Sequence, residues 1–127
     1  MINLAISVPG KFYTDAITEA LEKTGDFRVR LLEESQKTAG DLSMIRGPEV
    51  VLLGVSVRQG FTLKERQGVI RGLRERAPNC KIVLFLDEQI SPEQTRDVTS
   101  LRQARLIDGF LYASGTMEYL VATLESI

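Results

Sequence analysis

Short apolar runs alternate with helical segments along this chain, and this alternation limits the folds it can adopt. The runs are rich in Val, Ile, Leu and Phe and are bounded by Gly, Pro or Asp, which is typical of buried strands. They are Ile2–Ser7, Phe27–Glu33, Glu49–Val55, Lys81–Leu86 and Gly109–Tyr112. Continuously apolar strands predict a parallel sheet covered on both faces. We therefore expect an α/β fold, the flavodoxin-like (βα)5 three-layer sandwich with strand order 2-1-3-4-5.

The segments between these runs have helical spacing. Lys11–Thr24 and Leu63–Ala77 each place apolar side chains on one face, and a last helix begins at Thr116. The segment from Ser35 to Arg46 has a weaker pattern and predicts a short or frayed helix.

A further helix is predicted by its start signal. Ser91, Pro92 and Gln94 have the spacing of a capping box with proline at the first helical position. We expect this helix to begin at Pro92 and to run to about Arg105.

The composition excludes several classes of function. The chain has no histidine, so it lacks the commonest general base and every Ser/His or Cys/His nucleophile pair. Its one cysteine, Cys80, can form neither an internal disulfide nor a His/Cys zinc site. We expect a protein that is not an enzyme and that has no cofactor and no metal site.

Length and charge limit the setting in which the protein works. The 127 residues are enough for one domain, so we expect a single domain over 1–127. The formal charge of -1 provides no overall field for nucleic acid or membrane. The apolar runs are far shorter than the ~20 residues of a membrane span. No export signal is visible at the N-terminus, so we expect a cytoplasmic protein.

Four stretches of sequence resemble one family of signalling domains. They are Ile2–Val29, Pro48–Gly54, Ile70–Val83 and Gly109–Leu120. The chain resembles the receiver domains of bacterial two-component response regulators, in particular those that precede a LuxR-type helix-turn-helix domain. The resemblance implies a CheY-like fold and a role in two-component signal transduction and transcription regulation.

The resemblance also shows where phosphoryl-transfer chemistry should lie, and the residues found there are unsuited to it. The family uses carboxylates for Mg2+, an aspartate nucleophile, a hydroxyl and a lysine. These positions fall on Val8, Pro9, Gly54, Leu86 and Ala113. We therefore predict a pseudo-receiver with a degenerate phosphorylation pocket that acts independently of phosphorylation.

The conformational switch of the family is altered as well. Its aromatic residue corresponds to Phe110, and the hydroxyl to which that aromatic responds corresponds to Leu86. Because leucine can only pack, we expect Phe110 to keep one rotamer and the output surface to be fixed.

The resemblance points to protein association as the remaining activity. Receivers commonly pair through their fourth helix, fifth strand and fifth helix. The candidate interface residues on these elements are Arg96, Arg102, Tyr112 and Tyr119. We expect a homodimer or a complex with a regulatory protein.

Direct binding of nucleic acid is not expected. Lys64, Arg71 and Arg74 fall on one side of the third predicted helix, with Arg66 near by. Acidic residues interleave, and Glu75 lies at i,i+4 from Arg71. This pattern predicts a solvated, salt-bridged helix face.

Two other functions stay open. The vacated acidic pocket, lined by Val8, Pro9, Gly54, Leu86 and Ala113, could accept an apolar metabolite, which would make the chain a small-ligand sensor. Alternatively, the chain could be an N-terminal localisation module of a ParA/MinD-like pilus-assembly ATPase, some of which carry receiver-like domains.

Overall fold

A five-stranded parallel sheet forms the centre of the molecule. The structure, a computed structural model, describes residues 1–32 and 49–127. The strands lie in the order β2-β1-β3-β4-β5, with bounds β1 Ile2–Ser7, β2 Phe27–Leu31, β3 Val50–Val55, β4 Lys81–Leu86 and β5 Gly109–Tyr112. The predicted flavodoxin-like order is therefore confirmed.

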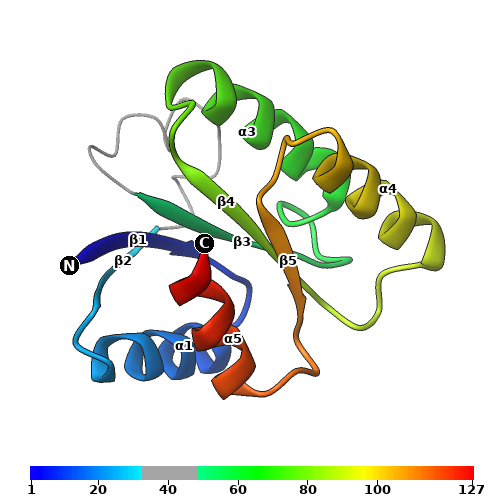
Figure 1. The fold of residues 1–127 in the computed structure, drawn as a ribbon. Coiled ribbons are helices and arrows are strands. Elements are labelled where there is room, and N and C mark those ends of the chain that lie inside the picture. Colours follow the sequence, from blue (N-terminus) through cyan, green and yellow to red (C-terminus); the bar gives the residue numbers. More distant parts are fainter. Residues whose placement is uncertain (33–48) are drawn as a thin grey trace.

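Helices cover both faces of the sheet, as the continuously apolar strands predicted. Their bounds are α1 Lys11–Lys23, α3 Leu63–Arg76, α4 Pro92–Gln103 and α5 Met117–Ser126. Helices α1 and α5 lie on one face, and α3 and α4 lie on the other (Figure 1). The helix predicted for Ser35–Arg46 lies outside the described residues.

The predicted helix starts and stops agree closely with the structure. The capping box of α4 is complete, because Gln94 N–H donates to Ser91 Oγ and Ser91 N–H donates to Gln94 Oε1. Helix α4 ends two residues before the predicted Arg105, which has a left-handed φ of 61°. The N–H of Leu106 then returns to Leu101 O at 3.0 Å, and that of Arg105 returns to Arg102 O at 3.1 Å. These two bonds are the Schellman arrangement that closes many helices.

The core has two layers because successive strand residues face opposite sides. On β4, Leu84 and Leu86 pack toward α3 and α4, whereas Val83 and Phe85 pack toward α1 and α5. All four side chains are buried. This two-sided burial explains why the strands read as unbroken apolar runs.

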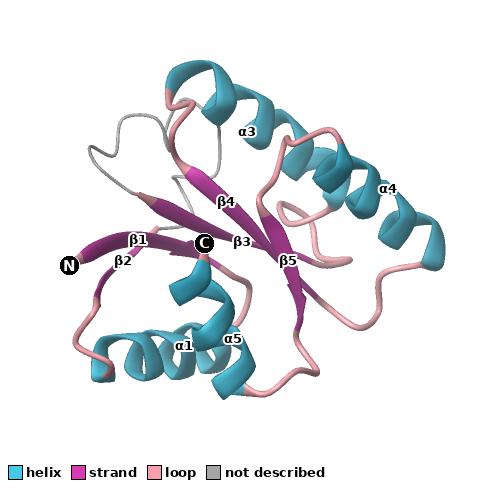
Figure 2. Cartoon of the chain, in the orientation of Figure 1, coloured by secondary structure: helices cyan, strands magenta, loops and turns pink. Residues whose placement is uncertain are grey.

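The strand order reverses between β1 and β3. From β1 the chain crosses to β2 on one side, and β3 pairs with β1 on the other, with Ser7 opposite Leu53. Loops follow the carboxyl ends of the strands (Figure 2), and residues after β1 and after β3, including Pro9 and Arg58, line one pocket at this end of the sheet. In open α/β sheets, binding sites form at such a reversal, beyond the carboxyl ends of the strands.

Among residues 1–32 and 49–127, no helix has both the length and the apolar character needed to cross a membrane.

Candidate functional site

The carboxyl ends of β1 and β3 bring three of the predicted site residues into contact. A Cβ atom added at Gly54 would lie 2.5 Å from Cδ of Pro9 and 3.0 Å from Cα of Val8. Carbon atoms that are not bonded to each other pack best at about 3.5–4.0 Å, so these approaches are too close for any side chain. Pro9 thus occupies the space in which a side chain at position 54 would begin.

A buried arginine lies beside this contact, and it corrects the sequence analysis. Arg66 was predicted to lie near a solvated helix face, but its side chain is completely buried. Helix α3 buries Leu63, Arg66, Ile70 and Leu73, which follow one another at helical spacing. The same spacing in the sequence places Arg66 within the apolar stripe, and this signal was overlooked.

The Arg66 guanidinium joins the ends of β1 and β3. Its Nε donates to Gly54 O at 2.9 Å, and its Nη2 donates to both Ser7 O and Ser7 Oγ at 2.9 Å. The guanidinium carbon lies 4.8 Å from the centre of the Phe61 ring, in cation–π geometry. Nη1 has no hydrogen-bond partner among the described residues.

Arg66 carries its charge in this buried position. Burial lowers the pKa of the guanidinium to about 10, and the negative charge of Glu65 opposes that shift. A group with that pKa is still protonated at neutral pH. A permanent cation is therefore built into the point where the strand order reverses.

The loop after β3 is held by its own backbone and by the cap of α3. Ser56 N–H donates to Phe61 O at 2.9 Å, which closes the loop and places the Phe61 ring over Arg66. Glu65 Oε1 accepts from Gly60 N–H at 2.8 Å and from the Thr62 hydroxyl at 2.7 Å. These hydrogen bonds lower the pKa of the Glu65 carboxyl. The ordered loop keeps Arg66 covered.

The other two predicted pocket positions pack in the apolar clusters on the two faces of the sheet. Leu86 is fully buried on the side of α3 and α4, where Phe110 packs against the same cluster. The Phe110 ring meets that of Tyr112 edge to face, with 6.0 Å between the ring centres. Ala113 packs on the opposite side of the sheet, toward α1 and α5. Leu86 and Ala113 therefore face opposite sides of the sheet.

The candidate interface residues all lie on the surface near one edge of the sheet. Strand β5 is the edge strand, and α4 and α5 flank it on opposite faces (Figure 1). Arg96 and Arg102 are exposed on α4, and Tyr112 is 43% exposed on β5. Tyr119 is 63% exposed on α5.

Arg74 is the second arginine of α3 that the sequence analysis misplaced. It donates to the backbone oxygens of Leu106 and Cys80 and forms an ion pair with Asp108 at 2.6 Å. Asp108 also accepts from Ile82 N–H at 2.8 Å. Arg74 thus ties α3 to β4 and to the loop before β5, instead of pointing into solvent.

In the described part of the chain, no group of three His, Cys, Asp or Glu side chains is placed to hold a metal ion.

Comparison with known proteins finds matches to the fold of this chain among solved structures. No protein-family model matches the chain, and no curated protein matches it in sequence. Solved structures do match. A LuxR-family DNA-binding response regulator from Staphylococcus aureus has 18% identity and a TM-score of 0.74 over 99% of this chain and 98% of its own.

Two further solved structures are longer than this chain. NtrX from Brucella abortus, solved with ADP, has 15% identity and a TM-score of 0.74 over 99% of this chain and 27% of its own. A streptococcal redox sensor, described as evolved from two-component response regulators, has 20% identity and a TM-score of 0.71 over 98% of this chain. The match covers 50% of that protein. The chain thus spans half or less of these two proteins, and it has the fold of response-regulator receiver domains.

Proposed function

We propose that this chain is a phosphorylation-independent receiver-like signalling domain that acts in the cytoplasm by associating with protein. The observation that carries the proposal is the Pro9 ring, 2.5 Å from where a side chain at position 54 would begin. In the receiver family that position holds the aspartate that accepts the phosphoryl group. Here it is a glycine whose carbonyl oxygen is already bound by Arg66.

The surrounding residues support the same conclusion. Phosphoryl transfer needs oxygen ligands for Mg2+ and preorganised positive charge around the transferred group. Val8 and Pro9 offer no carboxylate at the metal-binding positions. The buried Arg66 is engaged with Ser7 and Gly54 and holds the two strand ends together. We infer that an internal cation has taken over the structural role of a bound ion at this site.

The packing of the switch positions supports a fixed output surface. Leu86 and Phe110 belong to one apolar cluster, and neither can form a hydrogen bond through its side chain. A phosphoryl group at this site could form no hydrogen bond with the Leu86 side chain, so it could not draw that side chain toward itself. The output surface is then constant, and signalling depends on the partner and its concentration.

We infer that the edge formed by α4, β5 and α5 is the surface that associates, as a homodimer or with a regulatory protein. Tyr112 and Tyr119 are exposed there beside the basic residues Arg96 and Arg102. Tyrosine and arginine are enriched in protein interfaces because they combine large contact areas with polar groups. The similar staphylococcal protein is a DNA-binding response regulator, which favours a role in transcription regulation.

Solution mass tests the proposal. Light scattering over a concentration series, with and without Mg2+ and beryllofluoride, measures association in the presence of a phosphoryl mimic. We expect the mass at each concentration to be unchanged by Mg2+ and beryllofluoride, and a dimer to form as the protein concentration rises. A mass that increases only when both are added would mean that a phosphoryl site survives, and the proposal would be wrong.

A further inference from the structure

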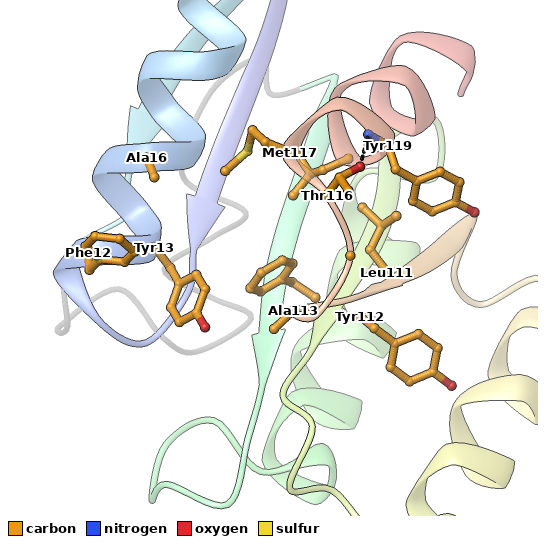
Figure 3. A pocket seen from close by; sticks show the side chains of 12 residues that line it. Phe12, Tyr13, Ala16, Leu111, Tyr112, Ala113, Thr116, Met117 and Tyr119 are labelled. Atoms are coloured by element: carbon orange, nitrogen blue, oxygen red, sulfur yellow. Dashed lines mark hydrogen bonds between the residues drawn. The ribbon is translucent and has the colours of Figure 1, made fainter.

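A small apolar cavity opens between α1 and the segment that joins β5 to α5. Its volume is about 120 Å3. Helix α1 forms one side, and β5 and the start of α5 form the other (Figure 3). The residues that shape its interior are Tyr13, Ala16, Phe85, Leu111, Ala113 and Met117.

Short side chains create this cavity. Ala16 and Ala113 contribute single methyl groups, and Gly115 contributes no side chain. Ala113 is also the residue found at the family's lysine position, so a long side chain is missing where the cavity lies. Protein interiors are otherwise close-packed, with few voids larger than a water molecule.

The lining defines the chemistry of what fits. No charged residue lines the cavity in the part of the chain that the structure describes. The rings of Tyr13 and Phe85 meet edge to face, with 5.8 Å between their centres. The Thr116 hydroxyl already accepts the N–H of Tyr119 at 3.1 Å, which leaves an interior of ring edges and aliphatic groups. Such a space favours a neutral, flat molecule over an ion or a sugar.

We propose that this cavity binds a small neutral aromatic molecule of one or two rings. A dry apolar cavity of about 150 Å3, lined by Leu, Ile and Phe, is known to bind benzene. The cavity here has a similar volume and a mainly apolar lining, but it opens to solvent beside Tyr13, which is 43% exposed. This proposal is independent of the phosphorylation-independent signalling proposed above, because it uses none of the contacts around Gly54 and Arg66.

A second copy of the chain is the competing occupant. Phe12 lies at the rim and is 81% exposed, so its ring could enter the cavity of another molecule. A small molecule is favoured over a Phe12 ring from a second copy for two reasons. Residues of α1, β4, β5 and α5 close the cavity on several sides, and its volume suits a small aromatic molecule. Binding of a second copy through Phe12 would raise the solution mass to that of a dimer, whereas binding of a small molecule would not, so solution mass distinguishes the two occupants.

Indole is a suitable probe because the chain contains no tryptophan. Its fluorescence can be excited beyond the tyrosine absorption and followed as protein is added. We expect saturable binding with a blue-shifted emission. The variants Ala113→Leu and Ala16→Leu should each weaken binding by about tenfold or more, because leucine fills the space that the probe needs.

Ala122→Leu is the matched control, since Ala122 is exposed on α5 and lies outside the cavity. It should bind indole as the unchanged chain does, and circular dichroism should confirm that all three variants are folded. Two cavity variants are used so that the test still decides if one fails to fold.

Three results would overturn the proposal. The first is the absence of saturable binding by the unchanged chain. The second is equal binding by the folded Ala113→Leu or Ala16→Leu variant. The third is a dimer that Phe12→Ser and the cavity variants each dissociate, with indole binding seen only in the Phe12→Ser variant, which would identify Phe12 of a second copy as the occupant.

Discussion

A proline ring and a glycine decide the chemistry of this site at the scale of single residues. Most receivers carry an acidic side chain where this chain has Pro9, and an aspartate where it has Gly54. In this structure the Pro9 ring lies where a side chain at position 54 would begin. We infer that the two changes are coupled, and we expect that reversing either one alone would not restore a usable pocket.

We predict that Gly54→Ala destabilises the protein by about 1–3 kcal/mol, because the new methyl group overlaps Pro9 and the backbone of Val8. Gly68→Ala is the matched control. Gly68 is exposed on α3 with no atom within 4 Å of an added Cβ, so this change should stabilise by about 0.5–1 kcal/mol. Urea unfolding followed by circular dichroism measures both.

The double variant Pro9→Ala/Gly54→Ala tests the coupling. Replacing Pro9 by alanine removes the Cδ atom that the new methyl group meets, so it should recover part of the stability lost in Gly54→Ala. The double variant should therefore lose less free energy of unfolding than the sum of the two single variants. Additive effects would show that Pro9 is not the cause.

The contacts of Arg66 predict how much its replacement changes the free energy of unfolding. We expect Arg66→Met to destabilise by about 3 kcal/mol, because the carbonyls of Gly54 and Ser7 lose their donors in a buried place. Arg66→Lys should recover little of this, since lysine lacks the planar fork that reaches both oxygens.

Arg71→Met on the same helix is the control for Arg66. Arg71 is exposed, and its replacement should change the free energy of unfolding by no more than about 0.5 kcal/mol. Equal effects of the two methionine variants would contradict the role assigned to Arg66.

At the scale of elements, the helices are set by local signals and the strands by burial. Helix α4 has its cap, its proline and its first carboxylate within four residues, Ser91 to Gln94. Its apolar face is narrow, with Val98 and Leu101 as its buried residues. A helix with so little buried surface depends strongly on its cap.

We predict that Ser91→Ala lowers stability by about 1 kcal/mol, because the N–H of Gln94 loses its acceptor at the start of α4. Ser100→Ala is the control, since the Ser100 hydroxyl bonds to a carbonyl within its own helix and is exposed. It should be close to neutral. Thermal unfolding of the two variants compares them, and an equal loss in both would indicate that the cap is not what stabilises α4.

At the scale of the whole molecule, the ends of the central strands differ from the β5 edge in what they expose. The ends of β1 and β3 are closed by Pro9 and Arg66. The exposed aromatic residues Phe12, Tyr13, Tyr112 and Tyr119 gather around the ends of α1, β5 and α5. We infer that recognition has moved from the centre of the sheet to its β5 edge.

Tyr119→Ser tests this view of the molecule. If the α4, β5 and α5 edge forms the dimer, the variant should raise the dimer dissociation constant by about tenfold or more, because exposed tyrosines are common interface anchors. Analytical ultracentrifugation measures the change. Phe12→Ser is the control on α1, and a dimer weakened by Phe12→Ser but not by Tyr119→Ser would place the interface elsewhere.

The strand order was predicted from the alternation of strands and helices, whereas the helix starts and the two-sided burial follow directly from local sequence. They depend on residues close together in the chain, such as the continuous apolar run of β4 and the Ser91 cap of α4. The resemblance to receivers also predicted which positions lack phosphotransfer groups. They are Val8, Pro9, Gly54, Leu86 and Ala113. What those positions do instead was not predicted.

The tertiary structure decided the contents of the site. Arg66 is 59 residues from Ser7 and 12 from Gly54 in sequence, yet its guanidinium bonds to both. The Pro9 ring meets position 54 because two parallel strands end side by side. Sequence patterns record which face of a helix or strand is apolar, but which atoms meet across the sheet depends on the packing of elements far apart in the chain.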